Sequence, residues 1–251
     1  KEEAGCVLRA ANPVVPVVRL RAKSKYHVLV TSAGGGYSSW QGLALTRWRE
    51  DATCDNWGAF CYLRDLASGA VWSTACQPTL GRADSYEAVF SSGLATFRRR
   101  DHDIETYTQI AVSPQDDVEL RRVDITNCSA TRREVEVTSY AEIVLAPPAT
   151  DAAHPAFSKL FVETEILRER QAILCTRRPQ APGEPTAWMF HLLASAKPAR
   201  EEVSYETDRL RSIGRGSTTA DPRGMHGNAP LSERAGPGPG PGAPARCRSR
   251  P

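Results

Sequence analysis

The sequence predicts an all-β protein in which two large antiparallel sheets pack face to face. Apolar residues recur with a period of two along many segments, and no stretch of a dozen residues shows a capped helical period of 3.6. Short polar or glycine-containing connections separate most of these segments. About a dozen strands exceed the seven of an immunoglobulin-type sandwich, and no internal repeat favours a propeller.

The individual strands follow from this pattern in chain order. We expect them at residues 26–32, 60–65, 70–75, 86–91, 94–100, 104–112, 117–127, 132–147, 161–168, 171–177, 188–195 and 203–213. Residues 132–147 alternate most strictly and form the longest predicted strand. In residues 117–127 the apolar parity changes between Leu120 and Val123, which predicts a β-bulge near Arg121 and Arg122.

Composition excludes several classes of protein. The chain of 251 residues has 32 Lys+Arg and 29 Asp+Glu, a formal net charge of +3, and its arginine pairs stand among carboxylates. Nucleic-acid binding needs clustered positive charge, so we expect no nucleic-acid partner. The seven cysteines contain no C-x-x-C pair, which favours free thiols over a zinc site. The apolar runs near the N-terminus are short and broken by proline, so no signal or membrane-spanning segment is expected.

Three regions are expected along the chain. Residues 1–24 are interpreted as an N-terminal extension, residues 25–234 as the β domain, and residues 235–251 as a Gly/Pro/Arg-rich tail. The tail has no apolar periodicity, so we expect it to be disordered or the product of a shifted reading frame. The absence of an initiating Met and this abrupt end together predict a fragment of a longer protein, truncated at its C-terminus.

A run of three glycines, Gly34, Gly35 and Gly36, is the most unusual local feature. It lacks the G-x-G-x-x-G spacing of a dinucleotide site, the Gly-Lys-Ser/Thr ending of a P-loop and the G-x-S-x-G of a nucleophile elbow. A tight turn is one interpretation, because glycine adopts positive φ without strain. The other is the wall of a sugar pocket, where the backbone can approach a ligand closely.

The residues that follow favour the sugar pocket. Tyr37, Trp40 and nearby tryptophans offer flat apolar faces, and Arg47 and Arg49 offer paired hydrogen bonds, which together suit a pyranose ring and its hydroxyl rim. The alternative is that the tryptophans are core residues and the charges form ion pairs with one another.

Four long segments extend the argument beyond composition. They are KYHVLVTSAGGGYSSWQGLALTRWRED, NWGAFCYLRDLASGAVWSTACQPT, FRRRDHDIETYTQIAVSPQDDVELRRVDITN and EVTSYAEIVLAPPATDAAHPAFSKLFVETE. They resemble the N-terminal β-supersandwich domain of glycoside hydrolase family 94, formerly glycosyltransferase family 36. Within it they are most similar to the phosphorylase-type region of the cyclic β-1,2-glucan synthases. The resemblance covers residues 25–236 and implies a galactose mutarotase-like supersandwich.

The resemblance implies that catalysis takes place in a domain other than this one. Family enzymes let inorganic phosphate attack a β-glucoside with inversion, and one carboxylic acid in an (α/α)6 barrel protonates the leaving oxygen. No residue of this sequence matches that acid, so we expect no catalytic residue, no cofactor, no metal and no turnover by the chain alone. Phosphate would be a co-substrate of the full-length enzyme, bound by the barrel.

By the same resemblance the domain binds carbohydrate at the edge of the active site and forms a homodimer. Tyr37, Ser38, Trp40, Arg47 and Arg49 are the candidate substrate-binding residues, and Gly34, Gly35 and Gly36 are expected to shape their loop. The ligand would be a β-glucan or gluco-oligosaccharide, and the missing barrel would be a partner. The location would be cytoplasmic, either in a simple phosphorylase or in the cytoplasmic part of an inner-membrane synthase.

Two other functions stay open. One is a free-standing glycan-binding module, and the other is an enzyme of mutarotase or epimerase type, which needs an acid and a base that converge on one sugar. Three further motifs are interpreted as structural: the acidic run around His102 as a solvated turn, His154 as a loop residue, and Asp116 with Asp117 as carboxylates that face opposite sides.

Overall fold

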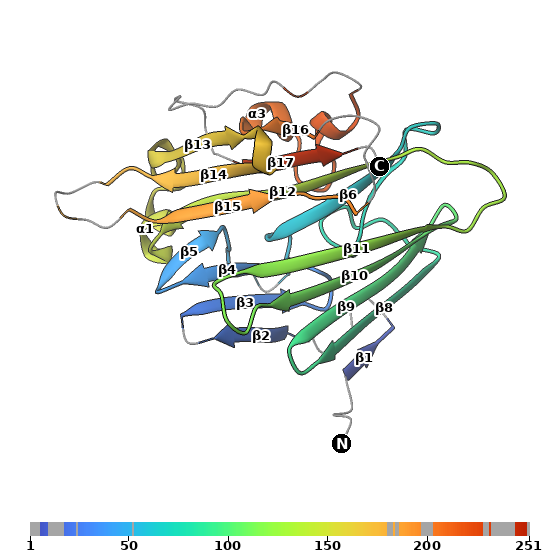
Figure 1. Ribbon diagram of the computed structural model, residues 1–251, viewed down its shortest axis with the longest axis horizontal. Coiled ribbons are helices and arrows are strands. Elements are labelled where there is room, and N and C mark those ends of the chain that lie inside the picture. Colours follow the sequence, from blue (N-terminus) through green and yellow to red (C-terminus); the bar gives the residue numbers. More distant parts are fainter. Residues whose placement is uncertain are drawn as a thin grey trace.

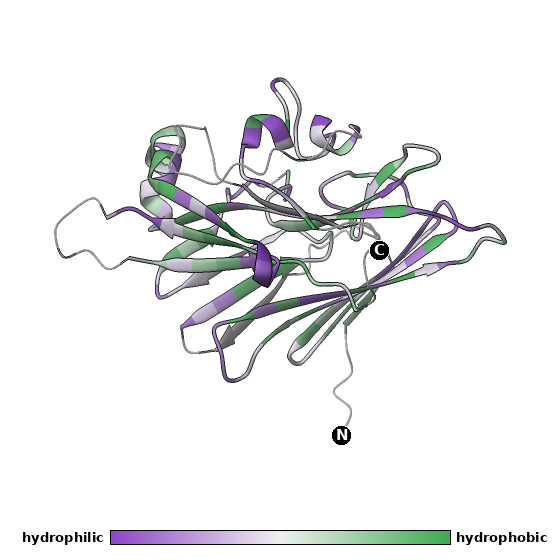
Figure 2. Cartoon of the chain, turned by 45° about the horizontal axis from the view of Figure 1, so that its top comes forward, coloured by the Kyte–Doolittle hydropathy of each residue, from purple (hydrophilic) through white to green (hydrophobic). Residues whose placement is uncertain are grey.

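The computed structural model describes residues 6–9, 18–23, 25–51, 53–179, 183, 186–196, 203–227, 231 and 244–249. It is built mainly from antiparallel strands in two layers (Figure 1). Hydrophobic and hydrophilic residues alternate along several of these strands (Figure 2). The predicted all-β class with large antiparallel sheets is confirmed.

The first layer is a nine-stranded sheet. Its order is β16 (Ser204–Glu206), β17 (Pro244–Ser249), β12 (Val135–Ala146), β5 (Leu43–Thr46), β4 (Gly36–Trp40), β3 (Tyr26–Thr31) and β2 (Val18–Lys23), and β6 (Ala59–Asp65) pairs with β12 and with β7 (Val71–Ser73). The long strand β12 holds this sheet together, because it pairs with β17 and β6 along its first half and with β5 near its end.

The second layer consists of two smaller sheets. The five-stranded sheet has the order β1 (Cys6–Leu8), β8 (Ser85–Ser91), β9 (Leu94–Asp101), β10 (Ile104–Val112) and β11 (Glu119–Asn127). The three-stranded sheet has the order β13 (Val162–Leu167), β14 (Ala172–Arg177) and β15 (Trp188–Leu192). The strands β11 and β15 are therefore edge strands of these two sheets.

Short helical segments fill the connections. They are α1 (Pro148–Ala153), α2 (Pro155–Ser158), η1 (Lys159–Phe161), η2 (Arg168–Arg170), α3 (Arg209–Ser212) and η3 (Arg223–Met225). The segment η1 leads directly into β13, and α1 follows β12 after a single residue, Pro147. These segments place polar side chains around the end of β12.

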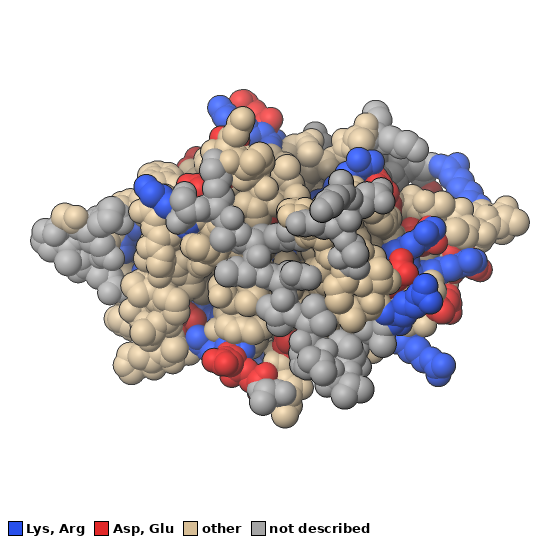
Figure 3. All heavy atoms as spheres, turned by 90° about the horizontal axis from the view of Figure 1, so that it is seen from below, with Lys and Arg blue, Asp and Glu red and all other residues tan. Residues whose placement is uncertain are grey.

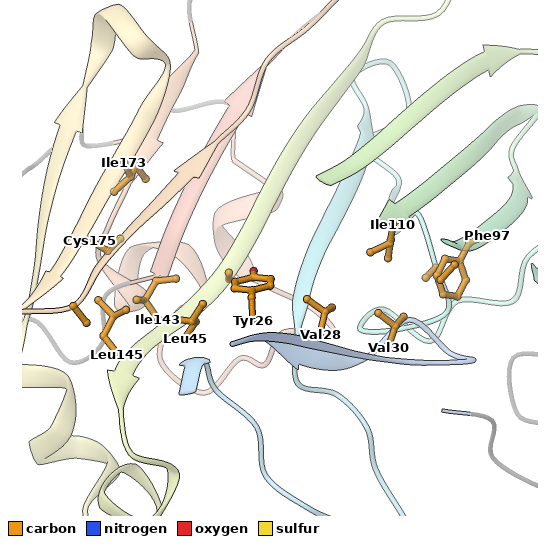
Figure 4. Packing of buried hydrophobic residues seen from close by; sticks show 14 of the residues in the cluster. Tyr26, Val28, Val30, Leu45, Phe97, Ile110, Ile143, Leu145, Ile173 and Cys175 are labelled. Carbon is orange, nitrogen blue, oxygen red and sulfur yellow. The ribbon is translucent and has the colours of Figure 1, made fainter. Parts of the chain in front are cut away.

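The main hydrophobic core lies between the two layers. Tyr26, Val28 and Val30 extend from β3, and Ile110 and Phe97 of the five-stranded sheet lie near one end of this row (Figure 4). The same cluster continues through Ile143 and Leu145 of β12 to Ile173 and Cys175 of β14. Alternate residues of each strand thus build one continuous core, as the period of two predicts.

The predicted bulge near Arg121 and Arg122 is wrong. Strands β10 and β11 pair without a break from Ile104 opposite Asn127 to Val112 opposite Glu119. The parity change has another cause: Glu119 and Arg121 share the inward face with Val123 and Ile125, whereas Leu120 points outward and is 59% exposed. The inward face of β11 therefore carries two charged side chains, Glu119 and Arg121, at positions where the alternating pattern predicts apolar residues.

An irregularity occurs in β12 instead. Its register with β5 shifts between Ile143 and Ala146, and Leu145 has φ of 52°. The strand is also buried on both faces, since Glu136, Thr138 and Tyr140 are as well buried as the apolar face. Its alternating sequence therefore does not mean that one face meets solvent.

The limits of the predicted regions also differ from the structure. The expected strand at 203–213 ends early, because Asp208 accepts a hydrogen bond from the Leu210 backbone N–H and starts α3. Within the predicted extension, β1 and β2 pair with β8 and β3. Within the predicted tail, residues 244–249 form β17, paired with β12 and β16, so disorder is wrong for this part. Residues 235–243 lie outside the described residues.

Candidate functional site

Strand β4 directs the predicted site residues to opposite sides of the sheet. Because side chains alternate along a strand, Ser38 and Trp40 share one face and Tyr37 lies on the other. The Ser38 backbone N–H donates to Thr46 Oγ1 at 2.9 Å. Tyr37 packs against Trp48, with ring centroids 5.7 Å apart. The structure therefore brings Ser38 and Trp40 together and separates them from Tyr37.

On the Ser38 face lies a group of five polar residues that we call the β4–β11 cluster: Ser38, Trp40, Asp117, Glu119 and Arg121. Ser38 Oγ donates to Glu119 Oε2 at 2.5 Å, and Trp40 Nε1 donates to Asp117 Oδ2 at 2.6 Å. Arg121 Nε donates to Glu119 Oε1 at 2.5 Å, and its Nη1 donates to the Ala59 carbonyl. These bonds link β11 in one layer to β4 and β6 in the other.

Two titratable side chains adjoin this cluster. Burial and the nearby Glu119 carboxylate raise the pKa of Tyr26 above its usual value, and its hydroxyl bonds to Ser38. His191 of β15 contacts Ser139 Oγ through Nε2 at 2.9 Å. Burial, assisted by the Arg121 charge and opposed by Glu119, lowers the pKa of His191 to about 4. The imidazole next to the cluster is therefore neutral near pH 7.

The cluster is a mixture of buried and accessible groups. Ser38 and Tyr26 are buried, the Glu119 side chain is 10% exposed and the Arg121 side chain is 25% exposed. Trp40 is partly buried against the main core, and Asp117 is exposed. An indole, two carboxylates and a guanidinium thus stand together where part of each remains within reach of a ligand.

The three glycines form a buried tight turn between β3 and β4. A Cβ on Gly35 would stand 2.1 Å from the Asp55 carbonyl oxygen, and one on Gly36 would stand 1.9 Å from the Leu29 carbonyl oxygen. Gly34 has φ of 92°, and the Gly35 backbone N–H donates to Thr31 Oγ1 at 3.0 Å. Close backbone packing therefore accounts for all three glycines, in agreement with the tight-turn interpretation.

Arg47 and Arg49 belong to a second assembly, the β12–α1 network, which consists of Arg47, Arg49, Glu142, Asp151 and Arg209. Arg47 donates to both Asp151 oxygens, at 3.0 and 2.7 Å, and to Glu142 Oε2 at 2.9 Å. Arg49 Nη2 donates to Asp151 Oδ2 at 2.8 Å, and Arg209 Nε donates to Glu142 Oε1 at 2.8 Å. Both arginines of the sequence prediction are therefore bonded to carboxylates of the chain itself.

The electrostatics of this network keep its acids ionised. Glu142 and Asp151 are buried, which by itself would raise their pKa values. The charge and hydrogen bonds of Arg209 and Arg47 outweigh burial and lower the pKa of Glu142 below its usual value. Hydrogen bonds and charge from Arg47 and Arg49 lower the pKa of Asp151 in the same way. These carboxylates are ion-pair partners at neutral pH.

The other acidic motifs have ordinary structural partners. Asp101 pairs with Arg99 at 2.6 Å, and Asp103 pairs with Arg100 at 2.7 Å. His154 is an exposed residue between α1 and α2. Within the described part of the chain, no group of three His, Cys, Asp or Glu side chains could hold a metal ion.

Sequence reasoning missed the residues that complete the β4–β11 cluster. The sequence pattern predicts only a β-bulge near Arg121 and treats Asp116 and Asp117 as carboxylates that face opposite sides. It singles out neither Glu119 nor His191, because both lie within predicted strands. One signal in the sequence could have found Glu119 and Arg121: both stand at odd-numbered positions of the strand, on the same face as Val123 and Ile125. Charged residues on the core face of a strand indicate a buried polar assembly.

Comparisons with known proteins agree with the fold. A family model described as "Glycosyl hydrolase 94, supersandwich domain" matches residues 5–248. The chain is 35% identical to the cyclic beta-(1,2)-glucan synthase NdvB of Rhizobium meliloti over 213 residues. The aligned region covers 85% of this chain and 8% of that protein.

Two phosphorylases are more distant relatives. Identity is 27% with N,N'-diacetylchitobiose phosphorylase of Vibrio furnissii, over 56% of this chain and 18% of the relative. It is 26% with solabiose phosphorylase of Paenibacillus borealis, over 65% of this chain and 20% of the relative. The chain thus spans a fifth or less of the length of each of these three proteins. Among the described residues, no helix is long and apolar enough to cross a membrane.

Proposed function

Because the chain belongs to the glycosyl hydrolase 94 family, as its supersandwich domain, we propose that it is the non-catalytic, carbohydrate-binding domain of an inverting β-glucoside phosphorylase or a cyclic β-1,2-glucan synthase. The relatives' names, a glucan synthase and two disaccharide phosphorylases, support a parent enzyme that acts on glycosides. In this proposal the domain works in the cytoplasm, in a phosphorylase or in the cytoplasmic part of an inner-membrane synthase.

Catalysis is assigned to an (α/α)6 barrel elsewhere in the parent protein. Inorganic phosphate would be its co-substrate, and this domain would need no cofactor. The ion-paired state of Glu142 and Asp151 supports a non-catalytic role for this domain. A general acid must hold its proton near neutral pH, whereas the pKa values of these two carboxyl groups are lowered.

An activity assay of the pure chain tests the non-catalytic part. With phosphate and β-1,2-gluco-oligosaccharides we expect no release of glucose 1-phosphate above a blank without protein. Phosphate-dependent release that grows with the concentration of the chain would contradict the proposal.

The carbohydrate contact is assigned to the β4–β11 cluster. The observation that carries this assignment is the hydrogen bond of the Trp40 indole to the exposed Asp117, in a cluster that also holds the partly exposed Arg121. An aromatic face stacks on the CH face of a pyranose, while carboxylate and guanidinium groups bond its hydroxyls. Ser38 and Glu119 would hold these groups in position, and a β-1,2-linked gluco-oligosaccharide is the proposed ligand.

Titration calorimetry with β-1,2-gluco-oligosaccharides tests the assignment. Trp40→Ala is expected to weaken binding at least tenfold, whereas Trp48→Ala, which removes the indole packed on Tyr37, is the matched control and should bind nearly as the wild type does. Equal affinity of the wild type and Trp40→Ala, or no binding by the wild type, would overturn it.

Homodimerisation is the third part of the proposal. On the outer face of β15, Trp188, Phe190 and Leu192 are 61%, 61% and 56% exposed, and a second copy of the chain is the proposed cover. Sedimentation at increasing concentration should show a dimer that Phe190→Lys weakens. A wild-type chain that stays monomeric at high concentration would contradict this part.

A mutarotase-like activity is the second candidate function. It is favoured by one observation, the electrostatic interaction between His191 and Glu119, since such an enzyme needs an acid and a base on one sugar. It ranks second because both Glu119 oxygens already accept hydrogen bonds from Ser38 and Arg121. Faster anomer exchange of glucose with the chain than with His191→Gln, followed by NMR, would establish it, and equal rates would exclude it.

A further inference from the structure

The turn between β10 and β11 presents two neighbouring aspartates in different ways. Ser113 Oγ donates to Asp116 Oδ2 at 3.3 Å, so the Asp116 carboxylate is bonded inside the turn. The Asp117 carboxylate leaves the turn and accepts from Trp40 Nε1 of β4 at 2.6 Å, across 77 positions of sequence. The second aspartate of the pair is therefore the one that reaches the β4–β11 cluster.

Backbone hydrogen bonds set the position of Asp117. The Ser113 N–H donates to the Val118 carbonyl at 2.8 Å and closes the turn. The Val118 N–H donates to the Asp116 carbonyl at 2.8 Å, a bond between residues two apart that forms a γ-turn with Asp117 at its centre. The exposed Asp117 thus stands at a tight bend immediately before the ladder of β11 begins.

The Ser113 side chain braces the same bend. Its Oγ accepts from the Asp116 N–H at 3.1 Å and from the Gln115 N–H at 3.3 Å, in addition to the bond that it donates to the Asp116 carboxylate. Serine hydroxyls that bond backbone N–H groups two or three residues further on hold a turn in one conformation. Three bonds from one hydroxyl therefore fix the residues directly before Asp117.

The Asp117 carboxylate keeps one oxygen for a ligand. Trp40 Nε1 bonds Oδ2, and no partner of Oδ1 occurs in the part of the chain that the structure describes. A carboxylate oxygen beside an indole can accept from a sugar hydroxyl while the indole stacks on the sugar ring. We propose that Ser113 is a positioning residue that makes Asp117, and not Asp116, the carboxylate that bonds the gluco-oligosaccharide. The bond to the sugar rests on the proposed carbohydrate contact, whereas the hold of Ser113 on Asp117 is independent of it.

The indole N–H resonance of Trp40 tests this hold without any ligand. Its absence from Trp40→Phe identifies it in a proton–nitrogen NMR spectrum, and Asp117→Asn gives its position when the acceptor is uncharged. Ser113→Ala should shift the resonance toward the Asp117→Asn position and speed its exchange with water, because the released turn forms the bond for only part of the time. Ser113→Thr keeps the hydroxyl and should retain the wild-type resonance. An unchanged resonance in Ser113→Ala would overturn the proposal.

Ser68→Ala is the matched control. Ser68 Oγ donates to Asp65 Oδ2 at 2.6 Å and accepts from the Ala70 N–H at 3.3 Å, so this serine braces the turn between β6 and β7 in a similar way. The control should leave the Trp40 resonance in place even where it lowers stability as much as Ser113→Ala does. A Trp40 shift of equal size in both variants would indicate a general loosening of the fold and would refute the role of Ser113.

Titration calorimetry with β-1,2-gluco-oligosaccharides tests which carboxylate the sugar uses. Ser113→Ala should weaken binding about fivefold, as expected for one misplaced hydrogen bond. Asp117→Asn should weaken binding as well, while Asp116→Asn and Ser113→Thr should bind nearly as the wild type does. Equal weakening by the two asparagine variants, or unchanged affinity in Ser113→Ala, would contradict the selection of Asp117. A wild type that does not bind, with a Trp40 resonance that still moves in Ser113→Ala, would overturn the carbohydrate contact and uphold the hold of Ser113 on Asp117.

Discussion

The β4–β11 cluster and the β12–α1 network both combine arginines with carboxylates, yet they use them differently. In the network, Arg47 is 3% exposed and bridges two buried carboxylates. In the cluster, Arg121 is 25% exposed and shares one carboxylate with Ser38. Burial and the number of bonded partners, more than residue type, therefore separate a structural assembly from one that can accept a ligand.

The two sheets of the second layer also differ in the side chains that their outer faces expose. The five-stranded sheet carries exposed pairs such as Arg98 with Glu105 and Arg122 with Asp124, whereas the outer face of β15 is apolar. In the face shown in Figure 3, charged side chains of both signs gather most densely toward the right-hand end, and smaller charged groups lie at the upper and lower edges. Exposed ion pairs of this kind contribute little to stability and mark a solvated face.

Removal of the central arginine of the network is expected to have the largest effect. Arg47→Met leaves Glu142 and Asp151 buried without their shared partner, and loss of one member of a buried ion pair costs about 3–5 kcal/mol. The free energy of unfolding from urea titrations should fall by about that amount.

The matched variant in the cluster is Arg121→Met. Its pair with Glu119 is accessible to water, so we expect a loss of about 1–2 kcal/mol. If both variants lost the same stability, the distinction between the two assemblies would not hold.

The pH dependence of stability should separate the two assemblies next. His191 has a pKa of about 4 in the folded chain and 6.5 as its ordinary value, so the folded state binds fewer protons between these limits. Its contribution is complete above pH 6.5 and decreases as pH falls toward 4. We expect about 1–3 kcal/mol from this group, and His191→Gln should flatten the slope in that window.

The network responds only at lower pH. The pKa values of Glu142 and Asp151 are lowered in the folded state, so their contribution is present above the usual carboxyl range and is lost as pH falls through the folded values. Asp151→Asn should therefore flatten the acid limb below about pH 4 and leave the His191 window unchanged. Urea titrations at closely spaced pH values measure both slopes, and a His191→Gln curve parallel to the wild type would contradict the assignment.

Most strands could be predicted because their apolar residues alternate locally. The exceptions have physical reasons. Strand β4 begins at the third of three glycines and contains two serines, and β17 has a composition typical of disorder, so their pairing with neighbours decides their structure. The segment after Asp208 becomes helical because that side chain caps it, a local signal that the strand pattern obscured.

The candidate site was less predictable, since it depends on contacts between distant segments. Ser38 meets Glu119 across 81 positions of sequence, and Arg47 meets Asp151 across 104. Sequence alone placed Ser38, Trp40, Arg47 and Arg49 in one pocket because they are neighbours in the chain. The fold sends them to two assemblies, Ser38 and Trp40 to the β4–β11 cluster and Arg47 and Arg49 to the β12–α1 network.

The smallest effect on stability is expected from Trp40→Phe. This change removes the hydrogen bond from Nε1 to the exposed Asp117 but keeps an aromatic ring against the core, so unfolding should become easier by less than about 1 kcal/mol. Affinity for gluco-oligosaccharide should nevertheless fall severalfold, because the smaller ring and an unanchored Asp117 both change the proposed contact surface. Arg47→Met should show the reverse, a large loss of stability with unchanged affinity in the chains that remain folded. Opposite rankings of the two variants in stability and in binding would establish that the assemblies have separate roles, whereas identical rankings would show that both serve only the fold.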